Sequence, residues 1–244
     1  MSYFIFNSVS SEDLGLIVLE RVARPSWACD VTEYEIAGNP TPVLIPKDTF
    51  QNAELVIRTA LVHKGDFSAL RRAFAVLNGF GTLTLSDYPD EYMNVFLKPI
   101  VPETKALYTS ELPIYATVRP FAYAVNPTVQ AVTASNTEVN NVGTVFSAPE
   151  IRFIPTSDSV IVTVNNVDFS VENLSQVGTQ SLIGKEVVID SEAHVTYFVG
   201  EDGRKWSVND HTFNDYPRLH TGLNYVRHNG NVSEMSINVR ERWL

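Results

Sequence analysis

The sequence predicts a mainly β protein with two domains, and three observations carry that prediction. Apolar residues recur at a spacing of two, which is typical of strands that bury one face. Turn signals separate such stretches at Asn165-Asn166, Asp202-Gly203 and Asn229-Gly230. The step Asn126-Pro127 disfavours a continuing helix and is followed by a polar stretch. We therefore predict separate domains over residues 1–126 and 127–244.

The first domain contains a series of short stretches with the composition of strands. β-branched and aromatic residues are frequent in them, and Gly, Pro and polar residues lie between them. The predicted strands are Tyr3–Phe6, Leu16–Glu20, Val31–Ile36, Ala53–His63, Thr82–Ser86, Tyr92–Lys98 and parts of Leu107–Phe121.

One segment of the first domain breaks this pattern and predicts a helix. Asp66 is suited to cap its N-terminus, and Asn78-Gly79 supplies a stop at its other end. Between them an apolar stripe recurs at helical spacing, formed by Phe67, Leu70, Phe74 and Leu77. The first domain is thus expected to be a β-sheet domain with one packed helix.

The second domain predicts antiparallel strands joined by tight turns. Around Asn165-Asn166 two apolar sets alternate and are expected to face one core: Val160, Val162 and Val164, then Val167, Phe169 and Val171. Asn229-Gly230 precedes a further alternating stretch, and both residues tolerate the positive φ of a type I′ hairpin turn. With Asp202-Gly203 this makes three hairpin signals, which indicate an antiparallel sandwich or jelly roll.

Composition excludes several classes of protein. The formal net charge is −10, which argues against a nucleic-acid-binding surface and against adhesion to an anionic membrane. Charged residues make up 19% of the chain, a low share that fits either burial in an assembly or a Ser/Thr/Asn-rich β protein. The single cysteine, Cys29, excludes an intramolecular disulfide. The opening MSYFIFNSVS lacks a signal-peptide pattern, so we expect the chain to be made and folded in the cytoplasm.

The search for catalytic motifs gives no candidate, and we predict no catalytic residue, metal site or cofactor. Nucleophile-elbow, phosphate-loop and zinc-helix motifs are missing from the sequence. The most enzyme-like group is Asp210, His211, Asp215, His220 and His228. Its spacing matches no known set of metal ligands, so we interpret it as a polar loop with surface histidines. A metal-dependent hydrolase using His211 is the most distant alternative.

Aromatic residues of the second domain leave a second alternative open. The C–H face of a sugar suits an aromatic ring, and Trp206 is the candidate for a glycan contact. Tyr197 and Tyr225 lie in strand patterns, where packing in the core is the default. A free-standing carbohydrate-binding module is therefore the alternative function.

Several segments of the chain form an ordered series of motifs. The first is the opening FIFNSVSSEDLGLIV (4–18), and the most specific is TLTLSDYPDEYMNVFL (82–97), with its Asp-Tyr-Pro-Asp-x-Tyr centre. The others are Arg24-Pro25-Ser26, KDTFQNAELVI (47–57), RPFAY (119–123), GTVFSAPEIRFIP (143–155), VIVTVNN (160–166), VVIDSE (187–192), YPRLHTGLN (216–224) and RERWL (240–244). Together these segments resemble the phage distal tail protein (Dit) family of siphovirus tail tips, although Asn7-Ser8 stands where Asn-Gly is commoner in that family.

This resemblance implies a structural protein of the virion tail tip. It implies an N-terminal β-sandwich with a helix, six copies of which close a ring that continues the tail tube and lets DNA pass. It also implies a C-terminal galectin-like β-sandwich on the outside. The expected partners are other copies of the chain, the tail tube protein, a tail-associated or fibre protein, and a receptor-binding protein.

The segment Asp87–Tyr92 holds the candidate structural or interface residues. Pro89 has no N–H and a fixed φ, which suits the connection between two strands. Tyr88 and Tyr92 are large amphipathic anchors. Packing within the subunit and contact between subunits are both open roles for them.

Overall fold

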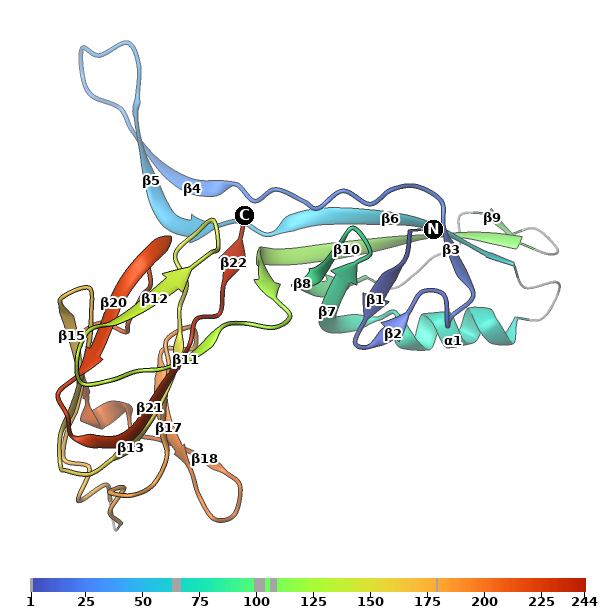
Figure 1. The fold of residues 1–244 in the computed structure, drawn as a ribbon. Helices are drawn as coiled ribbons and strands as arrows, with labels where there is room; N and C mark the ends of the chain where they lie inside the picture. The colour runs from blue at the N-terminus through green and yellow to red at the C-terminus, as the bar shows by residue number, and fades with distance from the viewer. Residues whose placement is uncertain (1, 63–66, 99–103, 106–108, 179) are drawn as a thin grey trace. The chain divides into compact units, whose positions relative to one another are not determined.

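The computed structural model describes residues 2–62, 67–98, 104–105, 109–178 and 180–244 (Figure 1). It is mainly β, as the sequence predicts, and it divides into two compact units. Unit 1 comprises Met1–Val125 with Leu244, and unit 2 comprises Asn126–Trp243. The division falls beside the Asn126-Pro127 step.

Unit 1 is built on one antiparallel sheet with the strand order β2-β1-β7-β8-β10-β6-β3, and β9 pairs with β10. Strands from both ends of this path contribute to one apolar core, so the sheet curls over that core in the manner of a sandwich. The strands are β1 (Phe4–Phe6), β2 (Val9–Ser10), β3 (Leu16–Val18), β6 (Ala53–Val62), β7 (Gly79–Leu85), β8 (Tyr88–Leu97), β9 (Thr104–Lys105) and β10 (Thr109–Ala124).

The predicted helix of unit 1 is α1 (Ser68–Val76). Leu70, Ala73 and Leu77 are buried against the sheet, and Phe74 packs beside them. The prediction that Phe67 belongs to the buried stripe is wrong. Phe67 is the N-cap residue, which precedes the first helical residue, and its side chain is exposed. The proposed cap Asp66 lies outside the described residues.

The turn between β1 and β2 shows how a serine replaces the expected glycine. Asn7 and Ser8 have φ values of 47° and 69°, and they connect the paired residues Phe6 and Val9. The Asn7 carboxamide accepts a hydrogen bond from the Thr82 backbone N–H (3.0 Å), which fixes the turn onto β7. Gly81 leaves room for that carboxamide, since a Cβ there would lie 2.4 Å from Asn7 Oδ1.

The start of β8 differs from the prediction for Asp87–Tyr92. The turn between β7 and β8 consists of Ser86 and Asp87 only, and Tyr88 already pairs with Leu85. Pro89 therefore lies in the second position of a strand rather than in the connection. A strand tolerates proline near its first residue, where no ladder hydrogen bond is lost.

A separate two-stranded sheet of unit 1 consists of β4 (Cys29–Tyr34) and β5 (Val43–Phe50). Figure 1 shows these strands as a long ribbon that other elements of unit 1 leave uncovered. We call residues 29–50 the arm. Strand β5 is missing from the sequence prediction because the stretch Pro42–Pro46 is short and has a proline at each end.

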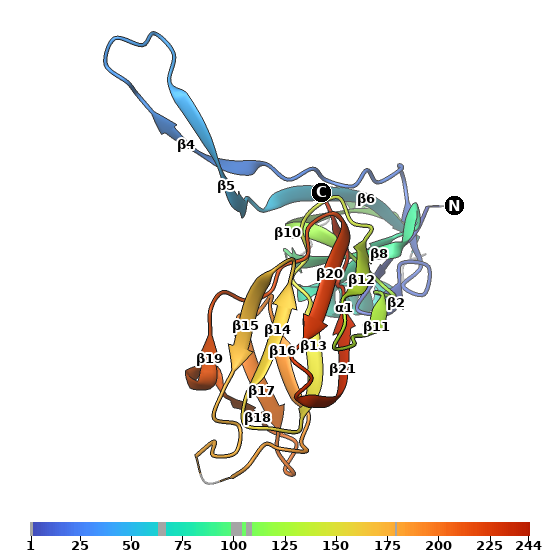
Figure 2. The ribbon, with the colours of Figure 1, turned by 60° about the vertical axis from the view of Figure 1, so that its left-hand side comes forward.

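Unit 2 is a sandwich of two antiparallel sheets, with strand orders β11-β21-β13-β16-β17-β18 and β12-β20-β14-β15-β19. Figure 2 shows the strands of both sheets. Side chains from both sheets form a single core. The elements are β11 (Val129–Ala131), β12 (Thr137–Asn141), β13 (Glu150–Pro155), β14 (Val160–Val164), β15 (Val167–Val171), β16 (Val187–Asp190), β17 (Val195–Val199), β18 (Lys205–Ser207), η1 (Asn209–His211), β19 (Thr212–Phe213), β20 (Gly222–His228), β21 (Val232–Asn238) and β22 (Arg242–Trp243).

Two of the three predicted hairpins are confirmed. Strands β14 and β15 pair through Asn165 and Asn166, both with positive φ, and β17 pairs with β18 around Asp202-Gly203. The prediction that Val167 faces the core is wrong. Val167 is the first residue of β15, next to the turn, and its side chain is 61% exposed.

The third hairpin prediction, at Asn229-Gly230, is wrong. Strand β20 pairs with β12 and β14, whereas β21 pairs with β11 and β13 in the other sheet. Gly230 does have positive φ, so the turn is tight as expected. The turn carries the chain from one sheet to the other, because each flanking strand buries its apolar face against the other strand's sheet.

No helix among the described residues has both the length and the apolar character needed to cross a bilayer.

Candidate interaction sites

Tyr88 packs against the motif Arg24-Pro25-Ser26 within unit 1. The guanidinium of Arg24 lies over the Tyr88 ring, 5.3 Å from its centre, and its Nη1 donates to Glu91 Oε2 (2.5 Å). Nη2 of Arg24 donates to the carbonyl of Leu244 (2.8 Å). The Arg24 side chain thus connects the Arg24-Pro25-Ser26 motif to the segment Asp87–Tyr92.

Tyr92 stacks on Tyr123, with ring centres 5.6 Å apart and planes 22° from parallel. The two residues are also direct partners in the pairing of β8 with β10. Tyr123 belongs to the RPFAY segment, so a second pair of the recognised motifs meets in the fold. Tyr88 and Tyr92 both have packing partners inside the subunit, and contact with another subunit stays a prediction.

The base of the arm is anchored by a bulge in β10. The register between β10 and β8 shifts between Val118 and Ala122, and Phe121 takes a positive φ of 76°. A positive φ is rare for a bulky residue, and here it accompanies the β-bulge at this register shift. It brings the Phe121 ring edge-on to Phe50 at the end of β5, 5.2 Å between centres.

Beyond this base both faces of the arm are apolar and exposed. The register Tyr34↔Val43, Thr32↔Ile45 and Val31↔Pro46 places Tyr34, Val43 and Ile45 on one face. Leu44 lies on the opposite face with Val31. The exposed large side chains are Val31, Tyr34, Ile36, Val43, Leu44 and Ile45, from 39% for Val43 to 59% for Leu44. Exposed apolar surface of this extent marks an interaction site.

The histidines of the enzyme-like group do not meet. His211 lines one pocket of unit 2, Asp215 and His220 line a second, and His228 lines a third. Among the described residues no three His, Cys, Asp or Glu side chains come close enough to hold a metal ion. The fold therefore places these residues, which are neighbours in the sequence, in three separate pockets.

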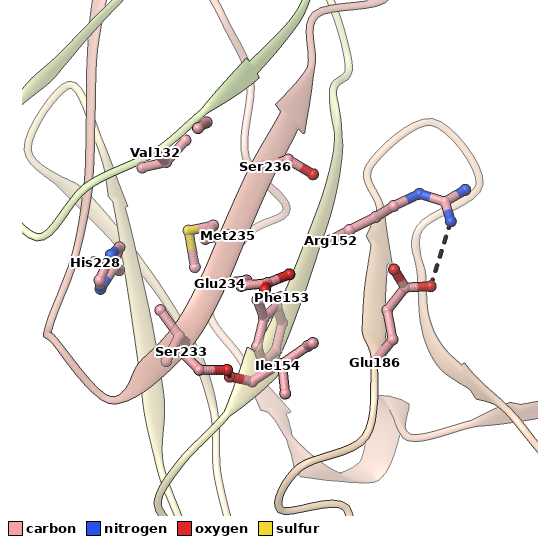
Figure 3. Close-up of a pocket in the computed structure, with 12 residues that line it drawn as sticks. Val132, Arg152, Phe153, Ile154, Glu186, His228, Ser233, Glu234, Met235 and Ser236 are labelled. Atoms are coloured by element: carbon pink, nitrogen blue, oxygen red, sulfur yellow. Dashed lines mark hydrogen bonds and ion pairs between the residues drawn. The ribbon is translucent and has the colours of Figure 1, made fainter.

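The pocket at His228 has a volume of about 430 Å³ and lies on strands β11, β13 and β21 (Figure 3). His228 stands on one side of it, and Arg152, whose Nη1 lies 3.3 Å from Glu186 Oε2, stands on the other. Burial lowers the pKa of His228, and a hydrogen bond to the Val132 backbone offsets part of that effect. Nδ1 of His228 accepts from the Gly230 N–H (3.0 Å), which fits a neutral ring.

An ion network that sequence reasoning missed lies close by in unit 2. Arg240 donates to Glu150 Oε2 (2.6 Å) and to Asp190 Oδ1 (2.7 Å). Burial acts to raise the pKa of Asp190, but the bond from Arg240 and two backbone N–H groups outweigh it and lower that pKa. The partners lie 50 and 90 residues apart in the chain, so no local motif could have revealed them.

Trp206 lies on the edge strand β18 and lines a pocket of about 520 Å³. Asp210 and His211 line the same pocket. The structure thus brings the glycan candidate together with part of the enzyme-like group, a juxtaposition that the sequence analysis did not anticipate.

The fold is similar to the folds of two solved phage tail structures. Over 100% of both chains it is similar to the crystal structure of Dit (gp 19.1) from phage SPP1, described as a paradigm of the hub adsorption apparatus in Gram-positive-infecting phages, with a TM-score of 0.74 and 15% identity. A chain of the activated phage p2 baseplate is similar over 99% of this chain and 98% of its own, with a TM-score of 0.53 and 7% identity. No family model and no curated protein sequence matches. The likeness confirms the Dit-like fold.

Proposed function

We propose that the protein is a structural hub of a siphophage tail tip. Six copies close a ring that joins the tail tube to baseplate, fibre and receptor-binding components and lets DNA pass. The observation that carries the proposal is the fold, which matches that of the SPP1 hub protein from end to end. The proposal assigns no catalytic activity and places the protein in the virion.

The arm supports ring formation through unit 1. A two-stranded ribbon has little stability alone in water, and this one exposes apolar side chains on both faces. A surface on a neighbouring subunit that covers those side chains would stabilise both. Because the arm and its receiving surface are different patches, the contact is heterologous, which is the kind that closes rings.

The charge of the chain supports passage of DNA. Both predicted halves carry more acidic than basic residues, and the net charge is −10. A channel wall of this character offers few cations to phosphate groups, so DNA slides rather than binds. The same composition argues against specific recognition of nucleic acid.

Unit 2 offers a surface for other tail components. Leu223 and Tyr225 on β20 point away from the core and are exposed. Together they form an apolar patch on the outer face of the β12-β20-β14 sheet. We assign this face to contacts with a fibre or receptor-binding protein, and the galectin-like character of unit 2 belongs to the same proposal.

The test is the size and shape of the assembled full-length chain. Light scattering over a range of concentrations should show a species of six subunits, and electron microscopy should show closed rings. The variant Tyr34→Ser with Ile45→Thr should stay monomeric at concentrations where the parent assembles. Val129→Thr, which removes an equally exposed apolar group from unit 2, is the matched control. Rings of another order, or rings that survive the arm substitutions, would contradict the proposal.

A further inference from the structure

The pocket at Trp206 has the shape and chemistry of a ligand site. Its volume of about 520 Å³ falls in the range of small-molecule sites. The floor is apolar and fixed, since Phe198 and Val208 are buried in the sandwich core. The rim is polar and includes Ser207, Asp210 and His211. Trp206 is 51% exposed, whereas Trp27 is buried.

The backbone holds the indole of Trp206 in place. The ring packs directly on Gly200, where a Cβ would lie 2.9 Å from Nε1 and 3.2 Å from Cδ1. Gly200 is itself fixed in the β17–β18 turn, because its N–H donates to Arg204 O (2.8 Å) and its carbonyl accepts from Gly203 (2.9 Å). The turn therefore holds the indole ring in a fixed place at the pocket, with about half of the Trp206 side chain exposed.

The ring of His211 is oriented by Glu172, the residue that follows β15. Nδ1 of His211 lies 3.1 Å from the carbonyl oxygen of Glu172, and the Glu172 N–H donates to the His211 carbonyl (2.9 Å). A carbonyl oxygen can only accept, so Nδ1 carries a hydrogen, and in the neutral form of the ring Nε2 is an acceptor. The Asp210 carboxylate beside it is exposed and is a second acceptor.

The charges near the pocket disfavour an anionic ligand. Arg204 is paired with Asp202 (3.6 Å), and the ammonium of Lys205 lies over the Tyr197 ring, 4.3 Å from its centre. The ammonium of Lys185 donates to Oε1 of Gln180, which lines the pocket (3.1 Å). Each of these described cations thus has a partner, and the pocket combines an aromatic platform with carboxylate and imidazole acceptors. A neutral polyhydroxyl ligand fits this combination, because its C–H face covers an indole and its hydroxyl groups donate to the acceptors.

We propose that this pocket binds a neutral hexopyranose unit of a glycan. Trp206 stacks on the sugar ring, and Asp210 and His211 accept hydrogen bonds from its hydroxyl groups. The site is independent of the ring proposed for unit 1, so either proposal can fail alone.

The experiment uses the full-length protein. A glycan array identifies the preferred terminal sugar, and titration with that sugar, beginning with glucose, galactose and N-acetylglucosamine, is followed by isothermal calorimetry, which does not depend on the fluorescence of Trp206. Trp206→Ala should weaken binding at least tenfold, the effect expected for losing a central aromatic contact. Asp210→Asn should also weaken binding, while Tyr225→Ala, an exposed aromatic on the other sheet, should leave it unchanged.

Three results would overturn the proposal. The first is no response to any sugar at millimolar concentration and no array signal. The second is an equal loss of binding in Tyr225→Ala. The third is a protein partner whose binding is lost in Trp206→Ala and is insensitive to added sugar, since that would make the indole a protein contact. Trp206→Ala should assemble as the parent does, and this readout keeps the two proposals separate.

Discussion

Two hairpins of this protein have the same local pairing and opposite surroundings. The β14–β15 hairpin turns through Asn165-Asn166 and buries Val160, Val162 and Phe169 in the core of unit 2. The β4–β5 hairpin pairs as regularly along its outer part, but its apolar side chains contact solvent on both faces. Backbone pairing alone therefore does not explain why the second hairpin exists. Its side chains indicate a surface supplied from outside the subunit.

The difference between the two hairpins is tested most directly by a pair of substitutions, one in each hairpin. Phe169→Ala should destabilise unit 2 by about 3–5 kcal/mol, because it empties a fully buried site. Ile45→Thr in the arm should change stability by no more than about 0.5 kcal/mol, as exposed substitutions do. Calorimetry of the full-length chain measures both. A large loss of stability from Ile45→Thr would show that the arm packs on its own subunit.

The second prediction concerns charge. The sandwich of unit 2 contains the ion pairs of Arg240 with Glu150 and Asp190. Arg240→Met should lower the free energy of unfolding by about 2–3 kcal/mol, because it leaves the Glu150 and Asp190 carboxylates without their cation. The loss is somewhat smaller than for a fully buried ion pair, because these side chains are partly exposed. Chemical unfolding at pH 7 measures the loss.

The same network predicts a pH dependence. In the parent the pKa of Asp190 is lower in the folded state than its ordinary 3.8, so its contribution is complete above that value. That contribution is lost as the pH falls through the folded pKa. In Arg240→Met burial is no longer opposed by the cation, so acid unfolding should begin at higher pH. Identical acid profiles for the two proteins would contradict this account.

Smaller effects are expected from the two tyrosines of β8 in unit 1. Tyr92→Ala should cost about 1–2 kcal/mol through loss of the stack on Tyr123, and Tyr88→Ala about 0.5–1 kcal/mol through loss of the Arg24 contact. Melting temperature and light scattering should be measured together. If both variants kept the parent's stability and assembly, neither packing nor subunit contact would stand as their role.

The parts of the fold that local patterns determine were predictable. Asn165-Asn166 forms its hairpin because two short polar residues accept positive φ, and the neighbouring strands share a face. Asn229-Gly230 has the same local chemistry, yet its strands belong to different sheets. A turn signal specifies the bend, whereas the partner of each strand depends on distant residues.

The candidate sites were less accessible to sequence reasoning for the same reason. Trp206 was recognised from its type, but its pocket also includes His211, whose ring is positioned by the carbonyl of Glu172, the residue after β15. The arm went unrecognised as a unit because Pro46 interrupts the strand pattern. Both sites depend on exposure, and exposure is a property of the folded chain.

Pro46 also determines how the arm can be recognised. A two-stranded ribbon has two open edges, and open edges attract further strands into fibres. Proline has no N–H, so β5 presents an interrupted row of donors to an incoming strand. Glu33 on β4 and Glu35 just beyond it place negative charge along the other strand, and identical arms repel one another there. The arm is therefore protected from pairing with identical arms, and the docking proposed for it would rest on side-chain contacts rather than on extension of a sheet.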